Sequence, residues 1–144
     1  MKRQRGFSLI EALIALVVLS IGLIGVAAMQ LKALQSANAG YQRSVASVAA
    51  VDAQERLWAQ MATLNSGQTC EDIAASAVQT AWKEHWFNNS SEATPLRGAS
   101  SGNSAIEISN RNASCRFRVI VALSDDENDQ FDYTFSLPRI GSSP

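Results

Sequence analysis

The sequence predicts an α+β protein in which a long N-terminal helix, apolar and membrane-spanning in its first half, packs on a small antiparallel β-sheet. Two observations carry this prediction. Residues 12–29 contain no charged side chain, and at about 1.5 Å per residue such a helix covers roughly 27 Å, close to the hydrocarbon thickness of a bilayer. Three later segments alternate apolar and polar residues, as half-buried strands do.

The charges around the apolar run predict its orientation in the membrane. Lys2, Arg3 and Arg5 are the only basic residues before Lys32. The positive-inside rule therefore keeps the N-terminus in the cytoplasm and sends the rest of the chain across. The net charge of -1 provides no basic field, so nucleic acid is not expected as a partner.

The junction before the apolar run indicates a special kind of leader. A short basic stretch ends at Gly6 and the apolar run begins at Phe7, whereas a secretory peptidase site would follow such a run. Cleavage between Gly6 and Phe7 would leave the helix in the chain. Glu11 places a carboxylate at the entrance of the apolar segment, where an ionisable group usually has a partner or a function. The α-amino group of Phe7 on a neighbouring subunit is the natural partner.

Parts of the sequence resemble known families. GFSLIEALIALVVLSIGLIG, residues 6–25, resembles the class III leader and N-terminal helix of type IV pilins and pseudopilins. Residues 10–34 and 43–59 are similar to the minor-pilin family called type IV pilus modification protein PilV. The resemblance implies the pilin-like lollipop fold, with Gly6 before the leader peptidase cleavage, Phe7 as the N-methylated first residue and Glu11 as the subunit assembly glutamate. A plain membrane anchor would explain neither Gly6 nor Glu11.

The resemblance implies a minor pilin of a type IV pilus, a structural subunit of the complex that primes assembly of a fimbrium used in cell adhesion and twitching motility. The implied partners are other minor pilins, the major pilin, the prepilin peptidase, the inner-membrane assembly platform and a tip adhesin. The implied location is the inner membrane, with the C-terminal domain in the periplasm, before assembly into the surface pilus. A minor pseudopilin of a type II secretion system and an unassembled membrane-anchored binding domain remain alternatives.

No motif for phosphate binding, metal hydrolysis or nucleophilic catalysis occurs in the sequence. We therefore expect no enzyme activity, no cofactor and no metal site.

The expected organisation is a leader at residues 1–6, a transmembrane and assembly helix at 7–29, its periplasmic continuation at 30–64 and a globular domain at 65–144. The continuation lacks proline and carries apolar residues at helical spacing: Leu34, Ala37, Tyr41, Val45, Val48, Ala49, Ala53, Leu57 and Met61. Gly22 and Gly25 allow close helix packing or local melting, or are ordinary transmembrane glycines. Major pilins usually carry a proline here, and its absence from this segment disfavours local melting.

A short second helix is predicted from Thr69 to about Trp86. Thr69 is the expected N-cap with Asp72 three residues later, and the expected apolar face contains Ile73, Ala77, Ala81 and Trp82. We expect Trp82 and Trp86 in the core rather than in an adhesive patch, and His85 on the surface. Residues 88–103 have the composition of a surface loop. The N-glycosylation triplets at 88–90, 89–91 and 112–114 are interpreted as chance matches.

The C-terminal part predicts three strands, around residues 106–108, 116–123 and 131–137. The acidic run 125–129 between the last two favours a solvated hairpin turn over a calcium site, because it lacks the glycine and distal glutamate of a helix-loop-helix calcium loop.

Cys70 and Cys115 are the only cysteines, and both fall in the part placed outside the cytoplasm, where a disulfide can form. Such a bond would close a loop of about 45 residues and stabilise the fold by roughly 4 kcal/mol. Two free thiols or a catalytic cysteine are the less favoured interpretations, because no local catalytic signature accompanies them.

Overall fold

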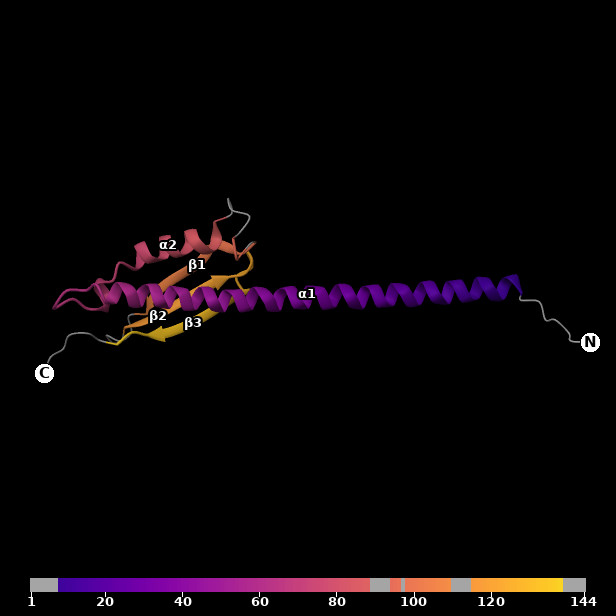
Figure 1. Ribbon diagram of the computed structural model, residues 1–144, viewed down its shortest axis with the longest axis horizontal. Helices are drawn as coiled ribbons and strands as arrows, with labels where there is room; N and C mark the ends of the chain where they lie inside the picture. Colours follow the sequence, from indigo (N-terminus) through magenta and orange to yellow (C-terminus); the bar gives the residue numbers. More distant parts are fainter. Residues whose placement is uncertain (1–7, 89–93, 97, 110–114, 139–144) are drawn as a thin grey trace, which may run out of the picture. The chain divides into compact units, whose positions relative to one another are not determined.

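The computed structural model describes residues 8–88, 94–96, 98–109 and 115–138. It divides into two compact units, Met1–Gly40 and Tyr41–Pro144, and we call the second the head unit. The elements follow in the order α1 (Leu9–Met61), the 3₁₀-helix η1 (Cys70–Asp72), α2 (Ala75–Phe87), β1 (Ser100–Ser109), β2 (Arg116–Ala122) and β3 (Gln130–Ser136). A long apolar helix followed by a small antiparallel sheet confirms the predicted α+β fold (Figure 1).

Helix α1 is 53 residues long and ends three residues earlier than predicted. After Met61 the backbone hydrogen bonds come to join residues three apart instead of four. The N–H groups of Thr63 and Leu64 donate to the carbonyls of Gln60 and Met61. The Thr63 hydroxyl also donates to the Gln60 carbonyl at 2.7 Å. These tighter bonds replace the α-helical pattern at the C-terminus, as is common in a last turn.

The sheet is antiparallel with the strand order β1-β2-β3. Val119 of β2 lies between Ile106 of β1 and Tyr133 of β3. The pairing of β1 with β2 is irregular between Ser100 and Ala105. There the Ser104 hydroxyl donates to the Ser100 carbonyl at 2.8 Å and accepts the Ala122 N–H at 2.9 Å. A buried serine thus completes the backbone bonding at the irregularity.

The core of the head unit combines small residues on α1 with large residues opposite them. The fully buried positions of α1 include four alanines: Ala46, Ala49, Ala50 and Ala53. Trp82 of α2 and Phe117 of β2 are also fully buried, and all belong to one hydrophobic cluster. In Figure 1, α2 and the sheet lie alongside the C-terminal part of α1. Ala49, Ala53, Leu57 and Met61, the last part of the predicted apolar stripe, are buried in this cluster.

Three sequence predictions about local structure are wrong. Thr69 does not cap α2: its backbone N–H donates to Asp72 Oδ2 at 2.7 Å around η1, and α2 starts at Ala75. Ala77 and Ala81 are exposed, because α2 turns Val78, Trp82, Trp86 and Phe87 to the core and the two alanines lie on the neighbouring, outward side of the helix. Strand β1 begins at Ser100, inside the segment predicted as loop, because the Ser104 hydroxyl supplies backbone partners that the composition does not reveal.

Other predicted features lie where expected, differ in their exposure, or fall outside the described residues. Trp82 and Trp86 are buried and His85 is exposed, as predicted. Tyr41 and Val48 are exposed although they continue the apolar stripe of α1. The cleavage site at Gly6 and Phe7 lies outside the described residues, as do all but Asn88 of the three glycosylation triplets.

Candidate assembly helix and its head unit

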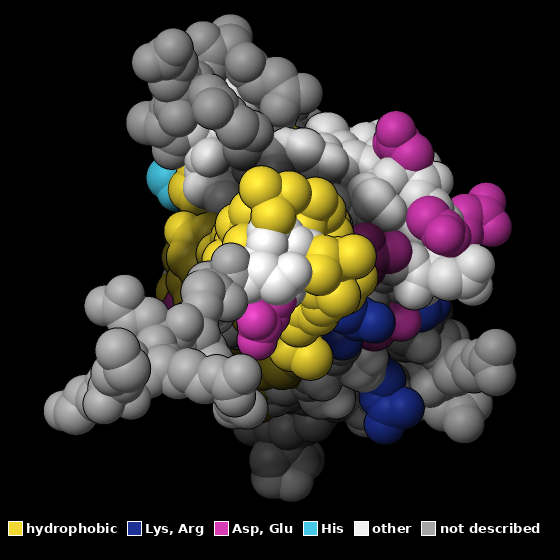
Figure 2. All heavy atoms as spheres, turned by 90° about the vertical axis from the view of Figure 1, so that its right-hand side faces the viewer, with side chains coloured by type: hydrophobic (Ala, Val, Ile, Leu, Met, Phe, Trp, Pro, Cys, Tyr) yellow, Lys and Arg dark blue, Asp and Glu magenta, His cyan; other side chains and the backbone are white. Residues whose placement is uncertain are grey.

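The first half of α1 has an apolar surface on every side. Between residues 9 and 29 every large apolar side chain is exposed, from 83% for Leu9 to 50% for Val17. Figure 2 looks onto the N-terminal end of α1 and shows hydrophobic side chains around most of it, with an acidic side chain at one side. The most apolar 18-residue window has a mean hydropathy of 2.7 and no buried residue. Among the described residues, α1 is the one helix long and apolar enough to cross a membrane.

Glu11 is the one charged residue on this surface within the described chain before Lys32. It lies in the first turn of α1 and is exposed. Its backbone N–H donates to the Ser8 carbonyl at 3.0 Å, so the helix start is formed without the carboxylate. A negative charge is favourable at a helix N-terminus. In a bilayer the same charge would still need a cation.

The polar and glycine positions further along the apolar surface do not break the helix. The Ser20 hydroxyl donates to the Leu16 carbonyl at 2.7 Å, which satisfies the hydroxyl without a partner from outside the helix. A Cβ atom added at Gly22 or Gly25 would meet no atom within 4 Å. Packing within this chain therefore does not require glycine at either position.

One comparison with known proteins bears on this helix. Residues 1–27 match the prokaryotic N-terminal methylation motif. The matched segment includes the Gly6–Phe7 junction and Glu11, and the motif supports a type IV pilin-like or pseudopilin-like protein. This pilin-type motif implies processing by the prepilin peptidase and involvement with the pilus assembly machinery. Neither the curated proteins nor the solved structures contain a match to the chain.

The motif and the apolar helix together support membrane anchoring. With the α+β fold, they indicate a structural subunit.

Two indole N–H groups attach α2 to α1 within the head unit. Trp82 Nε1 donates to the Ala49 carbonyl at 2.8 Å in a buried bond. Trp86 Nε1 donates to Asp52 Oδ2 at 2.8 Å, and the same oxygen accepts from Arg56 Nε at 2.7 Å. Buried indoles usually find such partners. These bonds fix α2 against α1 along two consecutive turns of each helix.

The sheet and η1 are attached by two further links. The Tyr133 hydroxyl of β3 donates to Gln54 Oε1 of α1 at 2.7 Å. Cys70 of η1 and Cys115, the residue before β2, form a disulfide across 45 residues of sequence. The bond therefore joins η1 to the start of the central strand, whereas the predicted helix from Thr69 would have placed Cys70 within the second helix.

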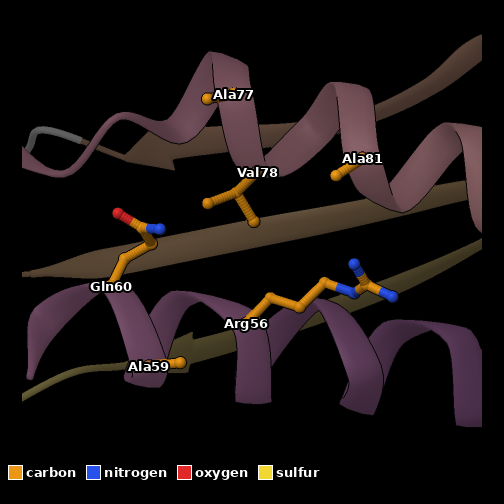
Figure 3. Close-up of a pocket in the computed structure, with 6 residues that line it drawn as sticks. All are labelled: Arg56, Ala59, Gln60, Ala77, Val78 and Ala81. Atoms are coloured by element: carbon orange, nitrogen blue, oxygen red, sulfur yellow. The ribbon is translucent and has the colours of Figure 1, made fainter.

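A shallow groove lies between α1 and α2 (Figure 3), with a volume of about 250 Å³. Arg56, Ala59 and Gln60 line it from α1, and Ala77, Val78 and Ala81 line it from α2. Arg56 already pairs with Asp52. These lining residues include neither a nucleophile nor an acid–base pair.

The β2–β3 connection is a turn, as predicted. Asp126 Oδ1 accepts from the backbone N–H of Asn128 at 2.9 Å and from its side-chain amide at 3.1 Å. These bonds hold the carboxylate within the turn. In the described part of the chain, His, Cys, Asp and Glu side chains form no group of three suited to a metal ion.

On the outer face of the sheet, Arg118 donates to Asp132 at 3.0 Å. This hydrogen bond and the charge of Asp132 raise the pKa of the exposed Arg118 guanidinium.

Sequence reasoning missed three residues that connect the elements of the head unit: Asp52, Gln79 and Ser104. Gln79 Oε1 accepts the backbone N–H of Ile106 at 2.8 Å. Each of the three is a polar residue inside or beside a run of regularly spaced apolar residues. A polar residue at such a position is the sequence signal that could have identified them.

Proposed function

We propose that this protein is a minor pilin of a type IV pilus, of the PilV type, cleaved between Gly6 and Phe7 and methylated on Phe7. It joins other minor pilins in the complex that primes filament assembly. The observation that supports this most is the methylation motif at residues 1–27, which ends in a helix whose apolar surface carries Glu11 as its single described charge before Lys32.

In this proposal the Glu11 carboxylate makes the contact through which one subunit assembles with another. A charged carboxylate in hydrocarbon is costly unless a cation approaches it or it is protonated. Cleavage after Gly6 creates such a cation, the α-amino group of Phe7, and the Phe7 of a neighbouring subunit can approach Glu11. The pair then fixes the axial register of two apolar helices, since apolar contacts alone differ little when one helix slides past another.

The experiment is complementation of a deletion strain at native expression, scoring membrane level and surface pili. Glu11→Val should preserve membrane insertion and strongly reduce piliation, because the apolar surface remains and the charge is lost. Glu11→Asp should restore part of the piliation, because the charge remains with a shorter reach. Ser20→Val is the matched control, since it also replaces an exposed polar side chain with valine on the same helix.

Normal piliation with Glu11→Val would contradict the assembly role and favour an unassembled membrane-anchored domain. If deletion leaves pili intact and instead blocks secretion of folded proteins, the chain is a pseudopilin of a type II secretion system. Reduced piliation with Ser20→Val equal to that of Glu11→Val would show that the effect is not specific to the carboxylate.

A further inference from the structure

The two edges of the sheet differ in how their backbone groups are used. In an antiparallel pair, residues that exchange backbone bonds alternate with residues that do not. The Leu123 N–H donates to the Asp129 carbonyl at 2.9 Å, and the Leu137 N–H donates to the Cys115 carbonyl at 2.8 Å. Asp129 and Leu137, which flank β3, therefore both bond to residues that flank β2. Because the register between them is regular, the odd-numbered residues of β3 bond to β2. The backbone groups of Gln130, Asp132, Thr134 and Ser136 point away from the sheet.

The opposite edge, formed by β1, is covered. The same alternation directs the N–H of Ile106 outward from β1, and the side chain of Gln79 on α2 accepts it at 2.8 Å. Helix α2 lies against β1, and the irregularity after Ser100 interrupts regular pairing there. A covering helix and an irregular pairing both protect an edge strand from pairing with another chain.

Among the residues that the structure describes, the β3 edge has neither a covering helix nor an irregularity in its pairing. Strand β3 is regular over all seven of its residues. Gln130, Asp132, Thr134 and Ser136 are exposed, and no backbone hydrogen bond of theirs is directed to another described element. A regular, exposed edge is a template for strand addition.

A row of aromatic side chains lies along the inner side of the same edge. Phe131, Tyr133 and Phe135 are only half-buried, although they face the core with Phe117 and Val119. Phe135 stacks on both Phe117 and Tyr133 with ring centroids 5.7 Å apart. An added strand would place alternate side chains beside this row, and apolar residues there would remove more of its surface from water.

Strand β3 and the turn before it carry acidic side chains, while Arg116 and Arg118 lie on the neighbouring strand β2. Asp132 lies on the outer face with 42% of its side chain exposed, and the adjoining turn carries exposed Asp125, Asp126 and Glu127. Arg118 is the one cation that the described residues place against Asp132. Opposite charges on neighbouring strands stabilise pairing and like charges oppose it.

We propose that the β3 edge binds an extended segment of another polypeptide, with apolar residues facing the aromatic row and lysine or arginine on the alternate, outward positions. The segment adds a fourth strand through the backbone groups of Asp132 and Thr134. This inference uses no property of Glu11 or of the leader, so it stands or fails separately from the assembly role.

The test uses the full-length chain in detergent micelles and a short acetylated peptide in which valine alternates with lysine or threonine. Amide hydrogen exchange should slow at Asp132 and Thr134 when the peptide is added, because their N–H groups acquire acceptors. Exchange at Tyr133 should change little, because its N–H already bonds to β2. The same peptide with glutamate in place of lysine should bind more weakly.

The Thr134→Pro variant removes an outward N–H without removing a bond to β2, and proline is tolerated on edge strands. It should weaken peptide binding about tenfold, the effect of losing one backbone hydrogen bond together with its geometry. Thr134→Val is the matched control, because it keeps the N–H and the branched side chain, and it should bind the peptide normally. The exchange measurement on the unmodified chain decides the question even if the proline variant fails to fold.

Three results would overturn the proposal. Fast exchange at Asp132 and Thr134 at saturating peptide would show that the edge does not accept a strand. Slow exchange without peptide that is lost on dilution would identify a second copy of this chain as the occupant. Slow exchange without peptide that is lost on truncation after Pro138 would identify the chain's own residues 139–144 instead.

Discussion

Replacing each tryptophan with phenylalanine gives a quantitative test of how α2 is held on α1. Trp82 is fully buried and donates to the Ala49 carbonyl at 2.8 Å. Phenylalanine is smaller by roughly 40 Å³, and at about 24 cal/mol per Å³ of residual cavity the loss of volume costs about 1 kcal/mol. Loss of the buried hydrogen bond adds about 1 kcal/mol. We therefore expect Trp82→Phe to lower the free energy of unfolding by about 2 kcal/mol.

The other two tryptophans serve as graded controls. Trp86 is 7% exposed, and its partner Asp52 retains Arg56, so Trp86→Phe should cost about 1 kcal/mol. Trp58 is 38% exposed, and Trp58→Phe should lie within about 0.5 kcal/mol of the unmodified protein.

The assay is urea unfolding of the full-length chain in a mild detergent, followed by the fluorescence of the two remaining tryptophans. A loss for Trp58→Phe as large as that for Trp82→Phe would refute this account of the interface. A change below about 0.5 kcal/mol for Trp82→Phe would show that the buried bond and volume carry little stability.

Two further predictions concern covalent chemistry. Non-reducing peptide mapping should recover Cys70 joined to Cys115, and replacing both with serine should lower stability by about 4 kcal/mol because the 45-residue loop is no longer closed in the unfolded chain; quantitative alkylation of both thiols before reduction would contradict the disulfide. Intact-mass measurement of assembled protein from its native host should give a chain that starts at methylated Phe7, and a mass that retains residues 1–6 would contradict the cleavage.

Sequence periodicity predicted the elements whose signals are local. The uncharged run in α1 and the alternation in β2 and β3 each depend on residues within one element, and the structure confirms all three elements. The start of α2 failed because Thr69 and Asp72 form a capping pair that is used around η1 rather than α2. A capping pattern shows that a turn begins, but not that a helix of several turns follows it.

The links between elements could not be predicted in the same way. Trp82 was expected in the core, but its acceptor is the Ala49 carbonyl, 33 residues away in sequence. Gln79 binds the edge of β1 across 27 residues. Such partners depend on how the elements pack, and no short-range pattern contains that information. The exposure of Ala77 and Ala81 follows from the same packing, because α2 turns Val78 and Trp82 to the core instead.

The alanine positions of α1 in the head unit have a consequence for sequence change. Ala46, Ala49, Ala50 and Ala53 have no exposed surface and face side chains as large as Trp82 and Phe117. A larger residue at any of these alanines would overfill a closely packed cluster. The larger residue would fit only if a residue opposite it on α2 or the sheet became smaller. Substitutions on the two sides of the cluster must therefore be coupled. Alanine is also the strongest helix former, so the same residues that leave room for Trp82 keep this stretch helical in water.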